Sequence, residues 1–273
     1  MSQPDVHEFP APTPITAVIR LGAGDLIVVA DDQPSVRVTV TSHDDSEASR
    51  TAAENTKVSM SGDRLDVEVP NTRGWGILRH SARVRIDVRL PQESQLRAQV
   101  ASAEVHTSGR LGEVKVEAAS GDTYVAETSR DLSVESASGD VRVQRVGGAL
   151  RVSTASGDVF ADWAGGSVHV NSASGDVTIE EATAGVRAST ASGDIHLGAV
   201  HGDQVKVNSA SGDVSVGVPA GTSVWLDLGT MSGSTSSDLP IGGEAPAGGV
   251  KLNLQVHTMS GDIRVHRVGP SAT

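Results

Sequence analysis

The sequence predicts an all-β fold: a single-domain parallel β-solenoid, that is a β-helix expected to be right-handed, with about 18 residues per rung and one short helix near the N-terminus. Three observations lead to this fold class. The tripeptide Ser-Gly-Asp occurs five times from Ser120 to Ser192, each time 18 residues after the last. Apolar residues keep fixed places within this period, and aromatic residues make up only 2% of the chain. Such a period is typical of repeat proteins.

One repeat unit, Ser138–Ala155, carries apolar residues at places 4, 6, 9, 13 and 15 counted from its serine. Places 4 and 6 alternate with polar residues, as do places 13 and 15, so each unit predicts two short strands separated by corners. Burying five such side chains returns roughly 8 to 12 kcal/mol, whereas ordering 18 residues costs on the order of 20 to 30 kcal/mol. Successive units must therefore stack in register to supply each other's missing contacts.

Two other repeat folds fit less well. The left-handed hexapeptide helix also uses about 18 residues per turn, but its apolar residues recur every six, whereas here the intervals are 2, 3, 4 and 2. A β-propeller blade needs about 40 residues and four strands. The pattern therefore favours a different solenoid.

The Ser-Gly-Asp tripeptide is interpreted as the corner that closes each rung. Glycine adopts positive φ without steric cost, and aspartate accepts hydrogen bonds from backbone N–H groups in turns. A row of Ca²⁺ ions is the alternative, but calcium-binding solenoids place an Asp and several Gly about every nine residues. We therefore expect no metal and no cofactor. The expected corner ladder consists of Gly121, Asp122, Gly139, Asp140, Gly157, Asp158, Gly175, Asp176, Gly193, Asp194, Gly212 and Asp213.

Outside the regular repeats the chain divides by composition and spacing. Four prolines in residues 1–14 predict an extended arm, and an Ala- and Glu-rich stretch predicts a short helix over residues 46–56. The tripeptide Ser61-Gly62-Asp63 fits either a β-hairpin or a solenoid corner. The expected solenoid covers residues 15–268, with divergent rungs in 15–101, regular repeats in 102–218, irregular C-terminal rungs in 219–268 and a tail at 269–273.

Two groups of residues are candidate partner contacts. A loop at residues 71–82 interrupts the strands, and its apolar residues either plug the open side of a rung or contact a partner or a membrane surface. Place 14 of the repeat stacks basic residues, which form either a solvated face or a binding surface. The candidates are Trp75, Ile77, Leu78 and Arg79 in the loop and Arg151, His169, Arg187 and Lys206 in the column.

The charge and the motifs of the sequence limit the classes of function that we expect. A formal charge of −12 and a pI near 5.1 argue against nucleic acid as a partner. The nine histidines are dispersed, and no metal-binding His pair, nucleophile elbow or phosphate-binding loop occurs, so we expect no enzymatic activity. The start of the chain lacks the basic and apolar parts of a signal peptide, and no run approaches the roughly 18 apolar residues of a transmembrane segment. A cytoplasmic location is expected.

The repeats, together with Gly109-Arg-Leu-Gly112, Val84–Pro91 and Val224–Leu228 before a long insertion, resemble a known bacterial family. It is the β-strand-repeat family of unknown function labelled "putative adhesin", in its actinobacterial form without a signal peptide. The resemblance covers the chain from about Ile15 to Val268. It implies a β-solenoid and supplies no catalytic residues.

These observations predict a non-enzymatic, adhesin-like β-solenoid scaffold that binds an unknown protein partner through its faces or ends. Solenoid ends expose unpaired strand edges, which can add a strand from a partner or from a second copy. A self-assembling structural solenoid is therefore an alternative. A carbohydrate-active β-helix enzyme is another, although it would need a cleft with acid and base groups and usually aromatic residues.

Overall fold

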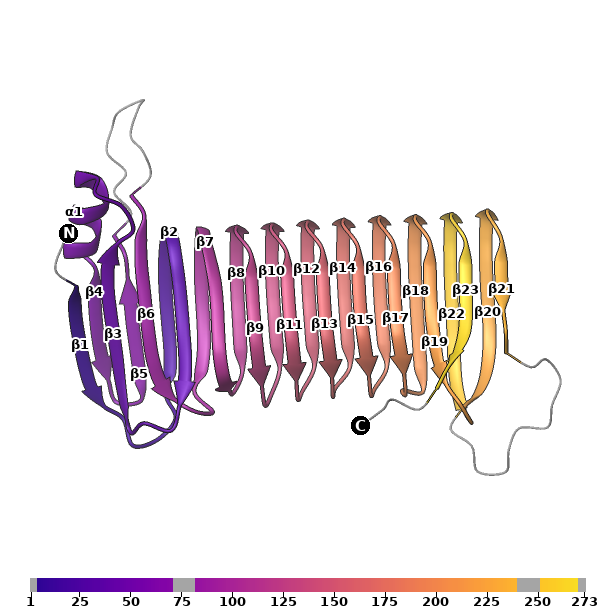
Figure 1. Ribbon diagram of the computed structural model, residues 1–273, viewed down its shortest axis with the longest axis horizontal. Coiled ribbons are helices and arrows are strands. Elements are labelled where there is room, and N and C mark those ends of the chain that lie inside the picture. The colour runs from indigo at the N-terminus through magenta and orange to yellow at the C-terminus, as the bar shows by residue number, and fades with distance from the viewer. Residues whose placement is uncertain (1–3, 71–81, 240–250, 270–273) are drawn as a thin grey trace. The chain divides into compact units, whose positions relative to one another are not determined.

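A computed structural model describes residues 4–70, 82–239 and 251–269. The chain forms two compact units, unit 1 (residues 1–139) and unit 2 (residues 140–273). Figure 1 labels the strands of both. Within each unit, β-strands form two walls, and along most strands buried residues alternate with exposed ones. No described helix is long and apolar enough to cross a lipid bilayer.

Unit 1 is organised around two long strands that run through both walls, β2 (Thr16–Asp31) and β7 (Gln95–Leu111), which pair in parallel. β2 passes from one wall to the other at Gly24, whose φ is 124° and where a Cβ would overlap the backbone of Val84. The other elements are β1 (Asp5–Pro10), β3 (Ser35–Ser42), α1 (Glu47–Glu54), β4 (Lys57–Ser61), β5 (Arg64–Glu68), β6 (Val84–Pro91), β8 (Val114–Ser120), β9 (Thr123–Thr128) and β10 (Leu132–Ser138).

The N-terminal end of unit 1 changes from parallel to antiparallel pairing. One wall runs in the order β4, β5, β2, β7, β8, β10, and only its β4–β5 pair is antiparallel. The other wall runs in the order β1, β3, β6, β2, β7, β9. Its β1–β3 and β3–β6 pairs are antiparallel, and its remaining pairs are parallel. Part of the expected extended arm is β1, an edge strand, where Pro10 is tolerated because one row of N–H groups needs no partner. The divergent rungs expected at residues 15–101 thus include antiparallel pairs.

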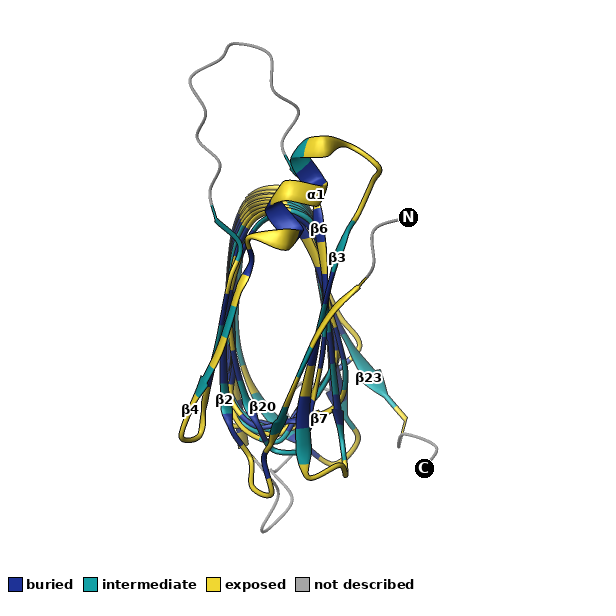
Figure 2. Cartoon of the chain, turned by 90° about the vertical axis from the view of Figure 1, so that its left-hand side faces the viewer, coloured by how far each residue is buried: buried dark blue, intermediate teal, exposed yellow. Residues whose placement is uncertain are grey.

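Helix α1 lies within the range 46–56 predicted for it and is shorter at both ends. Ser46 is its N-cap: the Ser46 Oγ accepts the Ser49 N–H at 3.1 Å. The helix ends because Asn55 leaves the helical conformation, with ψ at 4°. The buried Ser49 Oγ accepts the Arg83 N–H at 3.0 Å, which ties α1 to the start of β6. The helix packs against β3 and β6 at this end of unit 1 (Figure 2).

The structure decides between the two interpretations of Ser61-Gly62-Asp63. Strands β4 and β5 pair antiparallel, and Ser61 lies opposite Arg64, so the tripeptide forms a hairpin turn. Gly62 has a φ of 61°, a left-handed conformation, whereas the corner glycines of the regular repeats have φ between 114° and 145°. The same tripeptide therefore takes two conformations in one chain.

Unit 2 consists of two all-parallel walls. Wall A contains, in spatial order, β12 (Leu150–Ser156), β14 (Val168–Ser174), β16 (Val186–Ser192), β18 (Gln204–Ser211), β22 (Lys251–Ser260) and β20 (Ser223–Ser232). Wall B contains β11 (Val141–Val146), β13 (Val159–Ala164), β15 (Val177–Ala182), β17 (Ile195–Val200), β19 (Val214–Pro219), β23 (Ile263–Val268) and β21 (Thr235–Ser237).

The core of unit 2 is a set of apolar columns, one residue per rung. Leu150 pairs with Val168, Val168 with Val186, and Val186 with Val205, and all four are buried. Each buried side chain stacks on its equivalents in the neighbouring strands, as adjacent strands lie about 4.8 Å apart. The predicted all-β parallel solenoid with about 18 residues per rung is confirmed by this register.

The last two rungs of unit 2 do not follow chain order. β22 pairs with β18 on one side and with β20 on the other, and β23 likewise lies between β19 and β21. After β19 the chain therefore skips one rung, forms β20 and β21, and returns to fill the gap with its C-terminal strands (Figure 1). We call β20 and β21 the terminal rung. The sequence predicted irregular rungs at 219–268 but not their order.

Candidate functional site

The aspartates of the corners hydrogen-bond from rung to rung. The Asp158 N–H donates to Asp140 Oδ1 at 3.0 Å, and the Asp176 N–H donates to Asp158 Oδ1 at 2.9 Å. Bonds of 2.7 to 2.8 Å continue the series through Asp194, Asp213 and Asp262. Each carboxylate thus satisfies a backbone donor of the next rung, which offsets the repulsion of about 0.9 kcal/mol between exposed like charges 4.8 Å apart.

The corner glycines are required by the close approach of successive rungs. Gly193 has a φ of 130°, and a Cβ there would overlap the carbonyl group of Gly175. In unit 1, Gly121 and Gly139 have φ of 114° and 117°, and Asp122 accepts the Val105 N–H through its backbone oxygen at 2.9 Å. The tripeptide therefore has a structural explanation in both units.

The ladder carboxylates make hydrogen bonds to the neighbouring rungs. Within residues 4–70, 82–239 and 251–269, no group of three or more His, Cys, Asp or Glu side chains could hold an ion. At the end of the ladder, hydrogen bonds from the backbone N–H and the hydroxyl of Ser234 lower the pKa of Asp262. These bonds favour the charged form and occupy one carboxylate oxygen.

The ladder ends at Ser234. Asp262 accepts the Ser234 N–H at 2.8 Å, so Ser234 occupies the ladder position of the terminal rung. Its tripeptide reads Ser232-Gly-Ser234 and lacks the aspartate that would accept the N–H of another rung. The sequence thus marks this rung as the end of the stack.

The terminal rung carries an apolar surface, which we call the apolar end. Its inward residues Val224, Leu226 and Leu228 are only half-buried, although Leu252, Leu254 and Val256 beside them on β22 are buried. β20 pairs with β22 and with no other described strand. Three large apolar side chains are exposed here: Trp225 (58%) and Met231 (85%) on β20, and Met259 (63%) on the neighbouring strand β22. The apolar end consists of Val224, Trp225, Leu226, Leu228, Met231 and Met259.

The methionines of the apolar end replace a small residue of the repeat. Met259 lies between Thr258 and Ser260, which pair with Ser209 and Ser211, so it takes the place that Ala210 has one rung earlier. Met231 takes the same place on β20. This surface was not predicted from the sequence, although the change from Ala to Met at one place of the repeat was a readable signal.

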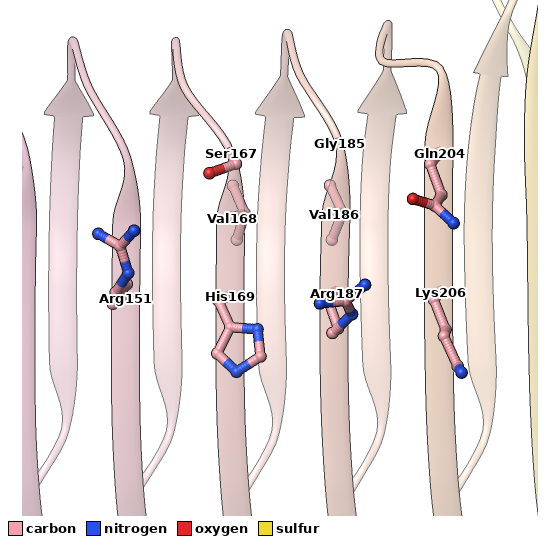
Figure 3. Close-up of a pocket in the computed structure, with 9 residues that line it drawn as sticks. All are labelled: Arg151, Ser167, Val168, His169, Gly185, Val186, Arg187, Gln204 and Lys206. Carbon is pink, nitrogen blue, oxygen red and sulfur yellow. The ribbon is translucent and has the colours of Figure 1, made fainter.

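Wall A brings the four predicted basic residues together. Arg151 pairs with His169, His169 with Arg187, and Arg187 with Lys206, on four neighbouring parallel strands. We call these four residues the basic column. They line a shallow groove of about 410 Å³ together with Ser167, Val168, Gly185, Val186 and Gln204 (Figure 3).

The neighbouring side chains do not neutralise the two cations Arg187 and Lys206 of the basic column. In the described part of the chain, no carboxylate lies within 4.0 Å of either residue. The His169 Nε2 accepts a hydrogen bond from the Asn171 Nδ2–H at 3.0 Å. Strands β12, β14, β16 and β18 contain no Asp or Glu.

The other predicted contact falls where the structure gives no description. Trp75, Ile77, Leu78 and Arg79 lie in residues 71–81, outside the described residues. The choice between a plug and a partner contact stays open for this loop.

A family comparison identifies the chain at the level of its fold family. The model described as Toastrack DUF4097 matches residues 25–266. The chain belongs to this family. The resemblance expected from the repeats is thereby confirmed, while the actinobacterial form of the family stays a prediction.

Solved structures resemble this Toastrack chain at low sequence identity. A "putative lipid binding protein" from Parabacteroides distasonis is 14% identical, with 97% of this chain and 96% of the other covered and a TM-score of 0.49. A "putative adhesin" from Bacteroides fragilis is 10% identical, with 98% of each chain covered and a TM-score of 0.46. A "putative cell adhesion protein" from Clostridium sporogenes is 10% identical, covering 97% and 100%, with a TM-score of 0.31. No curated protein matches the chain.

Proposed function

We propose that this Toastrack protein is a non-enzymatic scaffold that binds a protein partner by strand addition at its terminal rung. The observation that carries the proposal is the apolar end: the outer edge of β20 pairs with no described strand, and its inward residues are only half-buried near exposed Trp225 and two exposed methionines. A free edge offers unpaired N–H and C=O groups to an extended segment. Exposed Met and Trp side chains supply adaptable apolar contact.

A different protein suits this edge better than another copy stacked in register. Inside unit 2 every rung interface contains an Asp Oδ1 that accepts the N–H of the next rung. Ser234 has no carboxylate, so a further identical rung would lose that bond. At the opposite end of the chain, unit 1 presents the antiparallel strands β1 and β4. Head-to-tail stacking of identical parallel rungs therefore lacks a matching partner surface.

The proposal is tested by placing a photo-crosslinking amino acid at position 225 in cells that make the protein. We expect one discrete cross-linked product, which is lost when Leu226→Lys puts a charge on the inward side of β20. The matched control carries the crosslinker at Thr178 on wall B, a half-buried position on an interior strand.

The mass of the product separates the alternatives. A product containing one copy of the chain and a second protein supports the scaffold role. A product of two copies would replace it with self-assembly, which sedimentation over a range of concentrations would show independently. Equal labelling from positions 225 and 178 would contradict a specific site at the terminal rung. Catalytic turnover in a glycan-degradation screen would contradict the non-enzymatic role.

A further inference from the structure

The basic column is unusual because Arg187 and Lys206 have no carboxylate beside them. In unit 1, some basic side chains pair with a carboxylate two residues along the same strand, as Arg64 does with Asp66 at 2.8 Å and Lys115 with Glu117 at 2.6 Å. Lys115 occupies the same place of the repeat as the basic column. In unit 2 the residues two places along are neutral: Ser153, Asn171, Ser189 and Asn208.

This loss of acidic neighbours does not follow from the fold. Both units use the same strand geometry, and an outward Glu such as Glu117 is accommodated there without difficulty. Stacked cations on neighbouring strands repel each other, so placing Arg187 beside Lys206 without a carboxylate costs stability unless an anion binds them. In a protein of formal charge −12, two adjacent cations, Arg187 and Lys206, with no carboxylate within 4.0 Å in the described part of the chain indicate an anionic ligand.

We propose that the basic column binds an acidic α-helix of a partner protein, lying across the strands along the stacking direction. The proposal rests on the scaffold role but uses a surface separate from the apolar end. Its first support is spacing. Four stacked residues on strands about 4.8 Å apart span about 14 Å.

An α-helix matches this length better than an extended chain does. Acidic residues at positions i, i+4, i+7 and i+11 lie on one face of a helix and span about 16 Å. Four alternate residues of an extended strand span about 20 Å. The remaining difference of about 2 Å for the helix is within the reach of the flexible Arg and Lys side chains.

The surroundings of the column also favour a narrow ligand. Strands β12, β14, β16 and β18 of wall A each end at a corner whose ladder aspartate is exposed, as Asp158 and Asp176 are. Five residues of strand, roughly 16 Å, separate Arg151 from the corner at Ser156. An anionic membrane laid on the wall would meet this acidic row as well, whereas a helix of about 10 Å diameter can cover the basic column alone.

The groove itself permits close approach. Ser167 and Gly185 lie beside the column on the strand entrances, and neither carries a large side chain (Figure 3). Wall A offers no aromatic residue on β12, β14, β16 or β18 against which a sugar ring could stack. These features favour a helix over an acidic glycan.

The test measures binding of fluorescent helical peptides to the full-length protein by anisotropy at low salt. One Ala-rich peptide of about 20 residues, long enough to be helical, carries Glu at i, i+4, i+7 and i+11. A second peptide has the same composition with the Glu residues distributed around the helix. We expect the first to bind about tenfold more tightly, and its binding to weaken as salt screens exposed charges.

Variants locate the binding surface. Arg187→Glu replaces an attraction by a repulsion and is expected to weaken binding of the aligned peptide about tenfold or more. Arg264→Glu, an exposed arginine on β23 of wall B, is the matched control and should leave binding unchanged. Leu226→Lys at the apolar end should also have no effect, so this proposal and the proposed function fail separately. Circular dichroism checks that each variant is folded.

Three results would overturn the acidic-helix proposal. The first is no binding of the aligned peptide at low salt, and the second is equal binding of both peptides. The third is Arg187-dependent binding of heparin or of phosphatidylserine vesicles that is tighter than peptide binding. That last result would assign the column to an acidic glycan or to a membrane surface.

Discussion

Asp213 and Asp262 are 49 residues apart in the sequence, yet the Asp262 N–H donates directly to Asp213 Oδ1 at 2.8 Å. The bond lies at the corner between two parallel pairings, β22 with β18 and β23 with β19. The terminal rung, β20 and β21, lies on the outer side of β22 and β23, away from β18 and β19. The terminal rung is therefore held in place by β22 and β23, which follow it in the sequence.

Removal of the C-terminal strands should release the terminal rung. Deleting residues 251–273 takes away β22 and β23, the only described neighbours of β20 and β21. We expect amide hydrogens of β20 to lose their protection against hydrogen exchange, while β16 keeps its own. Deleting only residues 270–273 is the control and should leave β20 protected. Retained protection of β20 in the long deletion would mean that it can pair directly with β18.

The ladder aspartates should act as hydrogen-bond acceptors rather than as charges. Asp176→Ala leaves the Asp194 N–H without its acceptor and should lower the free energy of unfolding by about 0.5 to 1.5 kcal/mol, because the site is exposed to water. Asp176→Asn keeps an oxygen acceptor and should remain close to the wild type. Urea unfolding measures both, with Asp162→Ala as a control at an exposed site on β13. Equal losses for Ala and Asn would point to the charge instead.

Alanine substitutions at two glycines with positive φ should distinguish the cost of backbone strain from the cost of a steric clash between rungs. Gly193→Ala introduces backbone strain and also a clash, because its Cβ meets the Gly175 carbonyl. It should destabilise the protein by more than about 2 kcal/mol. Gly221 has a φ of 84° with open space where a Cβ would lie, so Gly221→Ala should cost only about 1 kcal/mol of backbone strain. Thermal unfolding of the two variants checks the difference. Similar losses would show that rung packing adjusts to the extra carbon.

The N-terminal boundary of α1 should respond to acid. The hydrogen bonds from the Ser46 side chain, from Ser49 and from the Ser46 backbone lower the pKa of Asp44 from 3.8 to about 2. Because the folded pKa is below the unfolded value, the stabilisation by Asp44 is fully present above about pH 4 and is lost as pH falls through 2. Carbon-13 NMR of the carboxyl group should give a midpoint near 2, shifting toward 3.8 in Ser46→Ala. An unchanged midpoint in that variant would contradict the assigned cause.

The basic column is a feature that the repeat period predicted from the sequence. The 18-residue period alone predicted Arg151, His169 and Arg187 on neighbouring strands, and the inserted residue before Val205 kept Lys206 in the same column. Stacked parallel strands must align equal places of the repeat, because one face of each strand is buried. The repeat also shows that the residue two positions after each member of the basic column is neutral, but this was not predicted.

The terminal rung and the first hairpin mark where the sequence was insufficient. Strands with equivalent apolar patterns can pair with any rung of the stack, so the sequence could not say whether β20 or β22 follows β18. The Ser-Gly-Asp tripeptide at Gly62 is likewise identical to the corners, and its hairpin conformation depends on the antiparallel pairing of β4 with β5.

The sequence by itself determined the rung, its corners and its columns, because a fixed period with buried valines permits one register only. Tertiary structure alone decided the order of the last rungs and left β22 as the one described strand that pairs with β20. Those features depend on which strands compete for the same neighbour, a choice made by long-range pairing such as that between Asp213 and Asp262.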